Sequence, residues 1–275
     1  MSKQIIFIAG AGRSGSTLLD ITLGNIKNHF SLGELIFFVE NGLINNEYCS
    51  CGSKVVDCEF WSKILMEWNK SRILTNEEFV NAQYSLLRNK KTLVNLYYCL
   101  FPKKKHADYL KDLKTLYSVI FEVSGMNILI DSSKNVQYIN QLKRLPFKLK
   151  VIHLKRSFFG VLNSAKKTIK KDPKLGVEKE LIPQSFTYTL SIWLFDNLFA
   201  KLFSIGLEYK RVSYESFIEN PSLELSKIME LTPDDKHLLK SRGPLKSKHL
   251  VAGNKLRMED NIYILKTSEE KRKIK

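Results

Sequence analysis

The glycine-rich turn at residues 10–15 limits the possible fold more than any other part of the chain. It follows an apolar run at residues 5–9, whose length and β-branched content are typical of a buried parallel strand. Apolar residues at helical spacing begin soon after it, at Leu18. Glycines let such a turn point its backbone N–H groups at an anion, and a helix N-terminus favours negative charge. The pattern predicts a phosphate-binding loop between a strand and a helix.

The turn fits the dinucleotide fingerprint G-x-G-x-x-G in part, with Gly10, Gly12 and Gly15 as its glycines. That fingerprint also needs an acidic residue about 20 positions further on, at the end of a second strand. Glu34 stands near that distance, but residues 28–33 make a poor strand. The dinucleotide reading is therefore incomplete.

The turn also fits the P-loop pattern G-x-x-x-x-G-K-[ST] in part. Gly10 and Gly15 match its glycines, and Thr17 matches the hydroxyl residue that would bind Mg²⁺. Ser16 stands where the lysine should reach the terminal phosphates, so nucleoside triphosphate chemistry would lack its main cation. Arg13 supplies a cation inside the turn instead.

Residues 13–19 resemble the 5′-phosphosulfate loop of sulfotransferases that use 3′-phosphoadenosine 5′-phosphosulfate (PAPS), especially the Golgi carbohydrate, protein-tyrosine and bacterial branches. Those branches read R-S-G-[ST]-[ST], and this chain reads R-S-G-S-T. The resemblance implies that the loop binds the 5′-phosphate of PAPS through Gly12, Arg13, Ser14, Gly15, Ser16 and Thr17.

A Gly-Glu pair at residues 33–34 extends the resemblance. In the protein-tyrosine branch such a pair follows the loop arginine closely, and its glutamate is the general base; here Glu34 follows Arg13 by twenty-one residues. A carboxylate with a raised pKa suits the removal of a proton from an acceptor hydroxyl. A solvated glutamate at a helix start is the plainer alternative. The cytosolic small-molecule branch uses a histidine base, for which His29 or His153 would be the candidates.

A second apolar run at residues 127–130 ends in Asp131-Ser132-Ser133-Lys134, where open α/β sheets place their ligands. The pattern also fits the metal-binding strand of a P-loop NTPase, but a lysine would add nothing to a Mg²⁺ site. In the sulfotransferases a lysine or serine here contacts the phosphates and the bridging oxygen of the cofactor. The resemblance implies that Ser132 binds the cofactor and that Lys134 takes part in catalysis.

A third apolar run ends at Arg156, and Ser157 is a plausible cap for the helix that follows. The 3′-phosphate motif of the family is an arginine at a strand end with a serine eight residues later, which Arg156 and Ser164 match. An arginine can hold phosphate oxygens bidentately. A strand-end salt bridge is the alternative. The second basic contact of the tyrosine branch falls on Thr168, which leaves that part of the 3′-phosphate shell open.

Residues 249–257 resemble the C-terminal H-x-x-x-G-N-x-x-R loop of bacterial sulfotransferases, which closes over the nucleotide. The resemblance implies that Gly253, Asn254 and Arg257 bind the cofactor; a plain basic surface loop is the alternative.

Three cysteines form a C-x-C-G…C-x-F-W segment that is similar to one in many bacterial members: Cys49, Cys51 and Cys58. Zinc sites usually show C-x₂₋₄-C spacing and need four ligands, and no histidine lies nearby in sequence. A disulfide would need an oxidising compartment. We expect no metal and interpret these cysteines as small buried apolar residues beside Trp61.

The net charge of +16 reflects either an anionic binding partner or a general bias in composition. The lysines form separate short groups at residues 103–105, 166–171 and 271–275, and no nucleic-acid recognition motif is present. A basic surface would attract PAPS and an anionic acceptor such as a glycan. Drift of the composition toward Lys, Asn and Ile explains the charge equally well.

Predicted strands at residues 4–9, 127–131, 149–154 and 208–212 alternate with helices and indicate an α/β fold with a P-loop-like, doubly wound parallel sheet. We expect a single domain over residues 1–275, with a helical insertion at about 59–124 and a possible lid loop at about 166–183.

Trp193 and Asn197 share a helix face, either in the core or on a pocket wall. The apolar stretch at residues 191–207 is interrupted by charges and predicts an amphipathic or buried helix, and the first strand leaves no room for a leader before it. We therefore expect a cytoplasmic enzyme without a membrane span. The Tyr214-Glu215 segment after the last strand is interpreted as structural.

Taken with the resemblance, these features predict an enzyme that transfers a sulfuryl group from PAPS to a hydroxyl acceptor without a metal. The acceptor class stays open among saccharides, lipids, peptides and small metabolites. A P-loop kinase and a non-catalytic anion- or carbohydrate-binding module are the alternatives.

Overall fold

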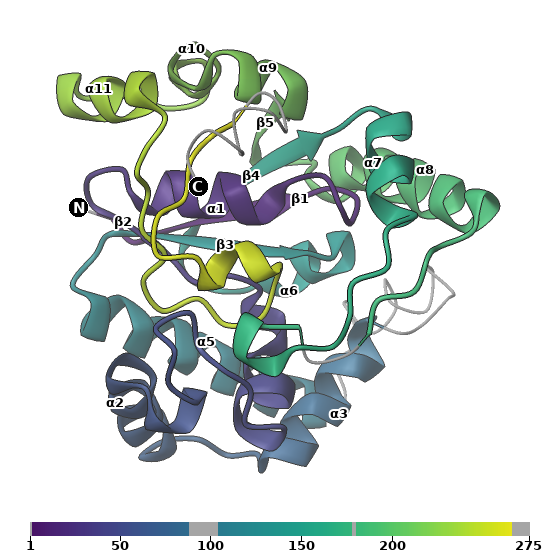
Figure 1. Cartoon of the computed structure of the whole chain (residues 1–275). Coiled ribbons are helices and arrows are strands. Elements are labelled where there is room, and N and C mark those ends of the chain that lie inside the picture. Colours follow the sequence, from purple (N-terminus) through teal and green to yellow (C-terminus); the bar gives the residue numbers. More distant parts are fainter. Residues whose placement is uncertain (1, 88–103, 178–179, 266–275) are drawn as a thin grey trace.

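A five-stranded parallel sheet forms the centre of the computed structural model, which describes residues 2–87, 104–177 and 180–265 (Figure 1). The strand order is β2-β3-β1-β4-β5. The strands are β1 (Gln4–Ala9), β2 (His29–Ser31), β3 (Ile128–Lys134), β4 (Lys148–Lys155) and β5 (Glu208–Ser213). The predicted α/β class and the four predicted strands are confirmed.

The sequence indicated that residues 28–33 make a poor strand, and this interpretation was wrong. Residues 29–31 form a fifth strand, β2. His29 and Ser31 pair with Ile128 and Ile130 of β3 at one edge of the sheet. An edge strand of three residues needs only one partner, so its pairing with β3 outweighs its weak intrinsic preference. The strand brings Gly33 and Glu34 to the carboxyl edge of the sheet, where β1 and β3 also end.

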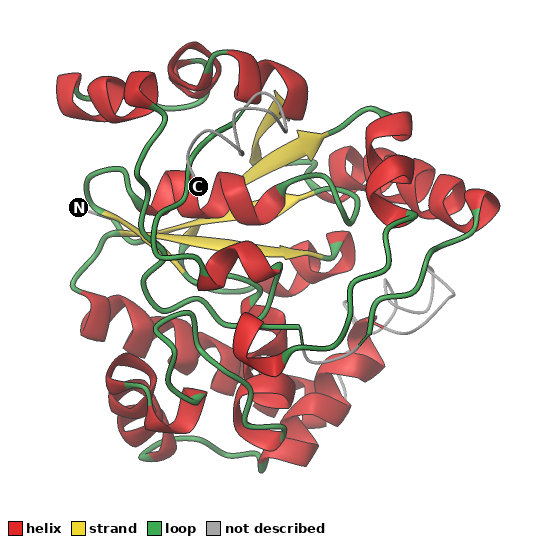
Figure 2. Cartoon of the chain, viewed as in Figure 1, coloured by secondary structure: helices red, strands yellow, loops and turns green. Residues whose placement is uncertain are grey.

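Two hydrophobic cores lie on opposite faces of the sheet, because successive side chains of β1 point to opposite sides. Ile6 and Ile8 face α1 (Ser16–Gly24) and the helices α9 (Tyr214–Glu219), α10 (Pro221–Ser226) and α11 (Pro233–Ser241). Ile5, Phe7 and Ala9 face the other core, which contains α2 (Glu59–Asn69), α3 (Asn76–Leu87) and α5 (Lys104–Ser124). Figure 2 shows the strands enclosed between these helical layers.

The helices α2, α3 and α5 follow β2 and precede β3, in the region where the sequence predicts a helical insertion. Trp61 and Trp68 of α2 are fully buried, and both rings contact Phe38. Residues 88–103 of the predicted insertion lie outside the described residues. That residues 1–275 form one domain stays a prediction.

Of the remaining described helices, α8 (Phe186–Phe203) is long and the others are short. The short ones are α6 (Ile139–Leu142), α7 (Phe158–Ala165), η1 (Leu35–Phe37), η2 (Phe38–Ile44), η3 (Val55–Asp57), η4 (Val136–Tyr138), η5 (Pro173–Leu175) and η6 (Lys255–Met258).

The helix α8 is more exposed than its apolar sequence suggests. Leu194, Leu198 and Leu202 are 53%, 67% and 51% exposed, so one side of α8 is an apolar surface rather than a buried one. Among the described residues, no helix is both long enough and apolar enough to cross a membrane.

Candidate active site

The phosphate loop joins β1 to α1, and its shape depends on two of its glycines. A Cβ atom at Gly10 would lie 2.3 Å from the carbonyl oxygen of Leu154. Gly15 caps the N-terminus of α1 with a φ of 91°, and a Cβ there would lie 2.3 Å from the ring of Tyr214. A side chain at either position would clash with its neighbour, and Gly15 also needs a left-handed backbone. The loop is thus held close to β4 and to the residue after β5.

Polar groups of this loop are arranged to meet an anion. Arg13 has a φ of 67°, which is uncommon for a residue with a side chain and is typical of functional sites. Its carbonyl oxygen accepts a 3.0 Å hydrogen bond from Nη1 of Arg156, whose guanidinium lies 4.4 Å from the centre of the Tyr214 ring. The Ser14 hydroxyl is buried and has no hydrogen-bond partner in the part of the chain that the structure describes. A buried hydroxyl without a partner is costly, and Ser14 does not line the cavity described below.

Glu34 is held by backbone contacts on two sides. The Gly33 carbonyl accepts a 2.8 Å bond from the Ser132 amide of β3, and the Glu34 amide donates a 3.0 Å bond to the Val251 carbonyl. Its side chain is only 10% exposed and forms an ion pair with Lys134. Lys134 ends β3 with a φ of 65°, a second strained position at the site. The ends of neighbouring strands therefore bring a carboxylate and an ammonium beside the phosphate loop.

The C-terminal loop covers this carboxylate. A Cβ at Gly253 would lie 3.5 Å from Oε1 of Glu34 and 3.6 Å from Oγ1 of Thr17, so the loop backbone passes close to both. The Asn254 amide donates a 3.4 Å bond to Oγ1 of Thr17, while its side chain caps η6. Arg257 is almost completely buried, and its Nη1 donates 2.7 Å to the Tyr48 carbonyl.

These elements surround a cavity of about 630 Å³. That volume is typical of a small-molecule site. Twelve of the predicted site residues line it: Gly12, Arg13, Gly15, Ser16, Thr17, Glu34, Lys134, Arg156, Ser164, Gly253, Asn254 and Arg257. The sequence motifs, which lie far apart along the chain, meet in one hollow.

Ser14 and Ser132 are the two predicted residues that do not line the cavity. The Ser132 hydroxyl donates a 2.7 Å hydrogen bond to Asp20 of α1, which also accepts 2.6 Å from the Ser31 hydroxyl. Burial raises the pKa of Asp20 to about 7, although both hydroxyls favour the charged form. Ser132 therefore ties β3 to α1, and its side chain is not part of the cavity wall.

The two histidines considered as alternative bases also lie away from the cavity wall. Nδ1 of His29 lies 2.7 Å from the Lys27 carbonyl, and burial lowers the pKa of this ring. His153 lies between the Tyr209 hydroxyl, at 2.6 Å, and Oδ1 of Asn197, at 3.0 Å. Burial lowers the pKa of His153 to about 4, so this ring is neutral at physiological pH. Of the three candidate bases, only Glu34 lines the cavity.

The structure adds wall residues that the sequence motifs did not identify, above all Tyr214. Its ring lies against Gly15 and beneath the guanidinium of Arg156, so the residue interpreted as structural forms part of the site. Trp193 also lines the cavity and donates a 2.9 Å bond to the Arg156 carbonyl, whereas Asn197 contacts His153 instead. A tyrosine that directly follows a parallel strand was the available signal for Tyr214, because ligands bind at that edge.

The loop predicted as a lid lies on the cavity wall. Four of its residues line the cavity: Ile169, Gly176, Val177 and Leu181. The backbones of Ile169 and Leu181 pair in an antiparallel β-bridge across the loop. Residues 178–179 of this loop lie outside the described residues. Its opening and closing stay a prediction.

Comparisons with known proteins identify the family of the chain. A family model described as "Sulfotransferase family" matches residues 5–232. No curated protein matches the chain. Similar solved structures include a sulfotransferase domain from the curacin biosynthetic pathway, at 17% identity and a TM-score of 0.47 over 85% of this chain and 76% of that chain. A second is a sulfotransferase from Mycobacterium avium, at 14% identity and a TM-score of 0.48 over 88% and 68% of the two chains.

The family model covers more than half of the sequence and includes the phosphate loop, Glu34, Lys134 and Arg156. The chain therefore belongs to the sulfotransferase family, whose members transfer sulfuryl groups.

Proposed function

We propose that this protein transfers the sulfuryl group of PAPS to the hydroxyl group of an acceptor, giving a sulfate ester and 3′,5′-ADP. The observation that carries the proposal is the Glu34–Lys134 ion pair beside the phosphate loop, within a cavity large enough for a nucleotide. A base for the acceptor and a cation for the leaving phosphate are the two groups that the reaction needs at one point.

The loop residues fit the 5′ end of the donor. Backbone amides at the start of α1 favour an anion, and Arg13, Ser16 and Thr17 line the cavity there. Arg156 and Ser164 line the same cavity and would bind the 3′-phosphate. The Arg156 guanidinium is already oriented by the Arg13 carbonyl and the Tyr214 ring, which lowers the cost of ordering it on binding.

Glu34 would take the proton of the acceptor hydroxyl as that oxygen forms a bond to sulfur. The bond between sulfur and the bridging phosphate oxygen breaks, and Lys134 with Arg13 would neutralise the charge that develops there. Lys134 is paired with Glu34 in the structure, so a donor in the cavity would compete for the same ammonium. If the Lys134 side chain moved toward the phosphosulfate, the Glu34 carboxylate would lose its ion pair and could accept a proton. Such catalysis depends on position and electrostatics, as in phosphoryl transfer.

The net charge of +16 favours one class of acceptor. A basic surface favours anionic acceptors such as acidic glycans. Incubation of the protein with sulfur-labelled PAPS and fractionated cell extract should label a fraction that binds an anion-exchange resin. Boiled protein is the control, and label in no fraction at all would favour a non-catalytic binding module.

Ligand specificity distinguishes the proposal from a kinase. Thermal unfolding should be shifted upward by 3′,5′-ADP without any added metal, because a ligand that binds only the folded state stabilises it. ATP with Mg²⁺ should shift it far less. Protection by ATP–Mg²⁺ and none by 3′,5′-ADP would contradict the proposal.

A further inference from the structure

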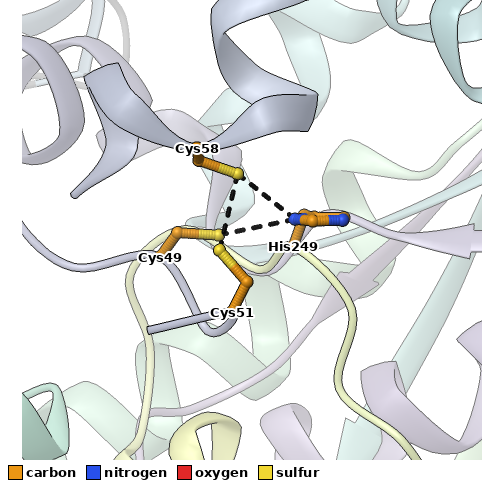
Figure 3. Close-up of side chains that lie close together, drawn as sticks. All are labelled: Cys49, Cys51, Cys58 and His249. Atoms are coloured by element: carbon orange, nitrogen blue, oxygen red, sulfur yellow. Dashed lines mark hydrogen bonds between the residues drawn. The ribbon is translucent and has the colours of Figure 1, made fainter. Parts of the chain in front are cut away.

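Three cysteines and one histidine meet at a point that is not part of the cavity wall (Figure 3). Cys49 and Cys51 belong to one turn, Cys58 lies at the start of α2, and His249 comes from the C-terminal segment. Their three sulfur atoms and the nearest ring nitrogen all lie within 4.8 Å of one another. His249 stands 200 residues from Cys49, so no sequence spacing connects them.

The separations fit a tetrahedral metal centre. Metal bonds of about 2.3 Å to sulfur and 2.0–2.1 Å to nitrogen place tetrahedral ligand atoms roughly 3.5–3.8 Å apart. The Cys51 and Cys58 sulfurs are 3.6 Å apart, and Nδ1 of His249 lies 3.2 Å from the Cys58 sulfur and 4.0 Å from the Cys49 sulfur. A disulfide would bring two sulfurs to about 2.05 Å, and all three cysteines carry unlinked sulfurs.

Backbone donors lie against two of the sulfur atoms. The Cys51 amide donates to the sulfur of Cys49, and the amides of Phe60 and Trp61 donate to the sulfur of Cys58. Cys58 also occupies the N-cap position of α2, where the helix dipole favours a negative group. Donors in these positions would hold metal-bound sulfur atoms in place.

The histidine is fixed as firmly as the cysteines. Its ring stacks on Phe60 with centroids 5.1 Å apart and planes 15° apart, and its carbonyl accepts 2.8 Å from Nε1 of Trp61. The next residue is bound to the cysteine turn twice: Leu250 donates to the Ser50 hydroxyl at 2.8 Å and accepts from the Ser50 amide at 3.1 Å. Contacts that orient a ligand in this way are typical of metal sites.

We propose that Cys49, Cys51, Cys58 and His249 bind a Zn²⁺ ion as a structural Cys₃His site. Three soft sulfurs and one imidazole are the donor set that zinc prefers, and four protein ligands leave no position for a substrate. The sequence argued against a metal because the cysteine pattern lacked a histidine, and the fold supplies it. The proposal does not depend on the reaction proposed above.

The zinc would join the segment before α2 to the segment that covers the active site. From His249 the chain runs through Val251, which pairs with Gly33, to Gly253, which lies beside Glu34. A metal at this junction would fix the C-terminal loop over the reacting groups. The binding free energy of a structural zinc contributes directly to the folding of the segments that supply its ligands.

Metal content tests the proposal directly. The full chain, purified without chelators, should hold about one zinc per molecule by elemental analysis. His249→Asn and Cys51→Ser should each lose most of this zinc to a competing chromophoric chelator that leaves the unaltered protein loaded. Cys51 is exposed, so its replacement should leave the near-ultraviolet circular dichroism of the folded chain intact. His237→Asn, at an exposed histidine on α11, is the matched control and should keep its zinc.

Cobalt substitution reports the ligand set. Co²⁺ in a Cys₃His site should give the intense visible bands of a tetrahedral ion together with thiolate charge-transfer bands, and both should weaken in Cys51→Ser. A reduced, folded chain that binds neither zinc nor Co²⁺ would overturn the proposal. So would full zinc content in both His249→Asn and Cys51→Ser, iron in place of zinc, or a Cys51–Cys58 disulfide in the protein as isolated.

Discussion

Replacement of Arg156 by alanine tests the 3′-phosphate assignment without knowledge of the acceptor. The half-buried guanidinium lies on the cavity wall and is held by the Arg13 carbonyl and the Tyr214 ring. Hydrogen bonds to a charged group contribute about 1.5–3 kcal/mol, which corresponds to roughly ten- to a hundredfold in affinity. Since Arg156 is not fully desolvated, we expect a loss of 3′,5′-ADP affinity in the lower half of that range.

A comparison of two ligands separates phosphate binding from support of the loop. Arg156→Ala also removes the hydrogen bond to the Arg13 carbonyl, so part of the loss should appear with any ligand that binds the phosphate loop. Isothermal titration of 3′,5′-ADP and of 5′-AMP gives both losses. We expect the loss for 3′,5′-ADP to exceed that for 5′-AMP by a few fold to about tenfold, because 5′-AMP lacks the 3′-phosphate.

The matched control is Arg144→Ala, which removes an exposed arginine outside the cavity wall. It changes the net charge equally, so it measures the effect of long-range attraction alone. Equal losses for the two ligands in Arg156→Ala would refute the assignment, since Arg156 would then act only through the loop. A loss of affinity of the same size in Arg144→Ala would mean that the loss in Arg156→Ala comes from the change in net charge alone.

Three further predictions follow from the site. Glu34→Gln should lower the rate of sulfuryl transfer by about 10²- to 10⁴-fold and leave 3′,5′-ADP affinity within a few fold. The control Glu67→Gln, which breaks an exposed ion pair, should change neither quantity. Unaltered turnover in Glu34→Gln would contradict the assignment of Glu34 as the base. Gly15→Ala should lower the thermal unfolding temperature clearly more than Gly12→Ala, because only Gly15 combines a φ of 91° with an occupied Cβ position. Burial raises the pKa of Asp20 from 3.8 to about 7, so the folded chain retains a proton that the unfolded chain releases; the stability that this proton provides is full below about pH 4 and is lost as the pH rises through about 7. Asp20→Asn should therefore reduce the decline in urea-unfolding free energy across that interval, and an unchanged slope would contradict the assigned shift.

The sheet could be predicted where the sequence carries its own signal. The runs at residues 4–9, 127–131 and 149–154 are largely apolar, and each became a parallel strand, as did the more polar predicted strand at residues 208–212. Residues 29–31 carry no such signal, and they form a strand because β3 offers an unpaired edge. Pairing of this kind depends on what lies beside a segment in space, which the residues of the segment do not encode.

The candidate site followed the same rule. Lys134 and Arg156 follow predicted strands, and parallel strands place their carboxyl ends together, whereas Glu34 was identified by resemblance because the strand before it was not predicted. Tyr214 also follows a strand, but its ring reaches the phosphate loop only because Gly15 has no side chain. The ring occupies the space that a Cβ atom at position 15 would fill. Ser132 was assigned to the cofactor by resemblance, whereas the alternation of β3 turns its hydroxyl onto Asp20.

The C-terminal loop shows why a motif can unite residues with separate tasks. The resemblance treated residues 249–257 as one nucleotide loop, yet His249 points to the cysteines while Gly253, four residues later, lies against Glu34. Val251 lies between them and pairs with the segment that carries Glu34, while Ala252 and Gly253 turn the backbone with φ values of 54° and 106°. A metal centre at one end of this segment would therefore set the position of the other. The cysteines, which the sequence left without a function, gain one through the same loop that covers the reacting groups.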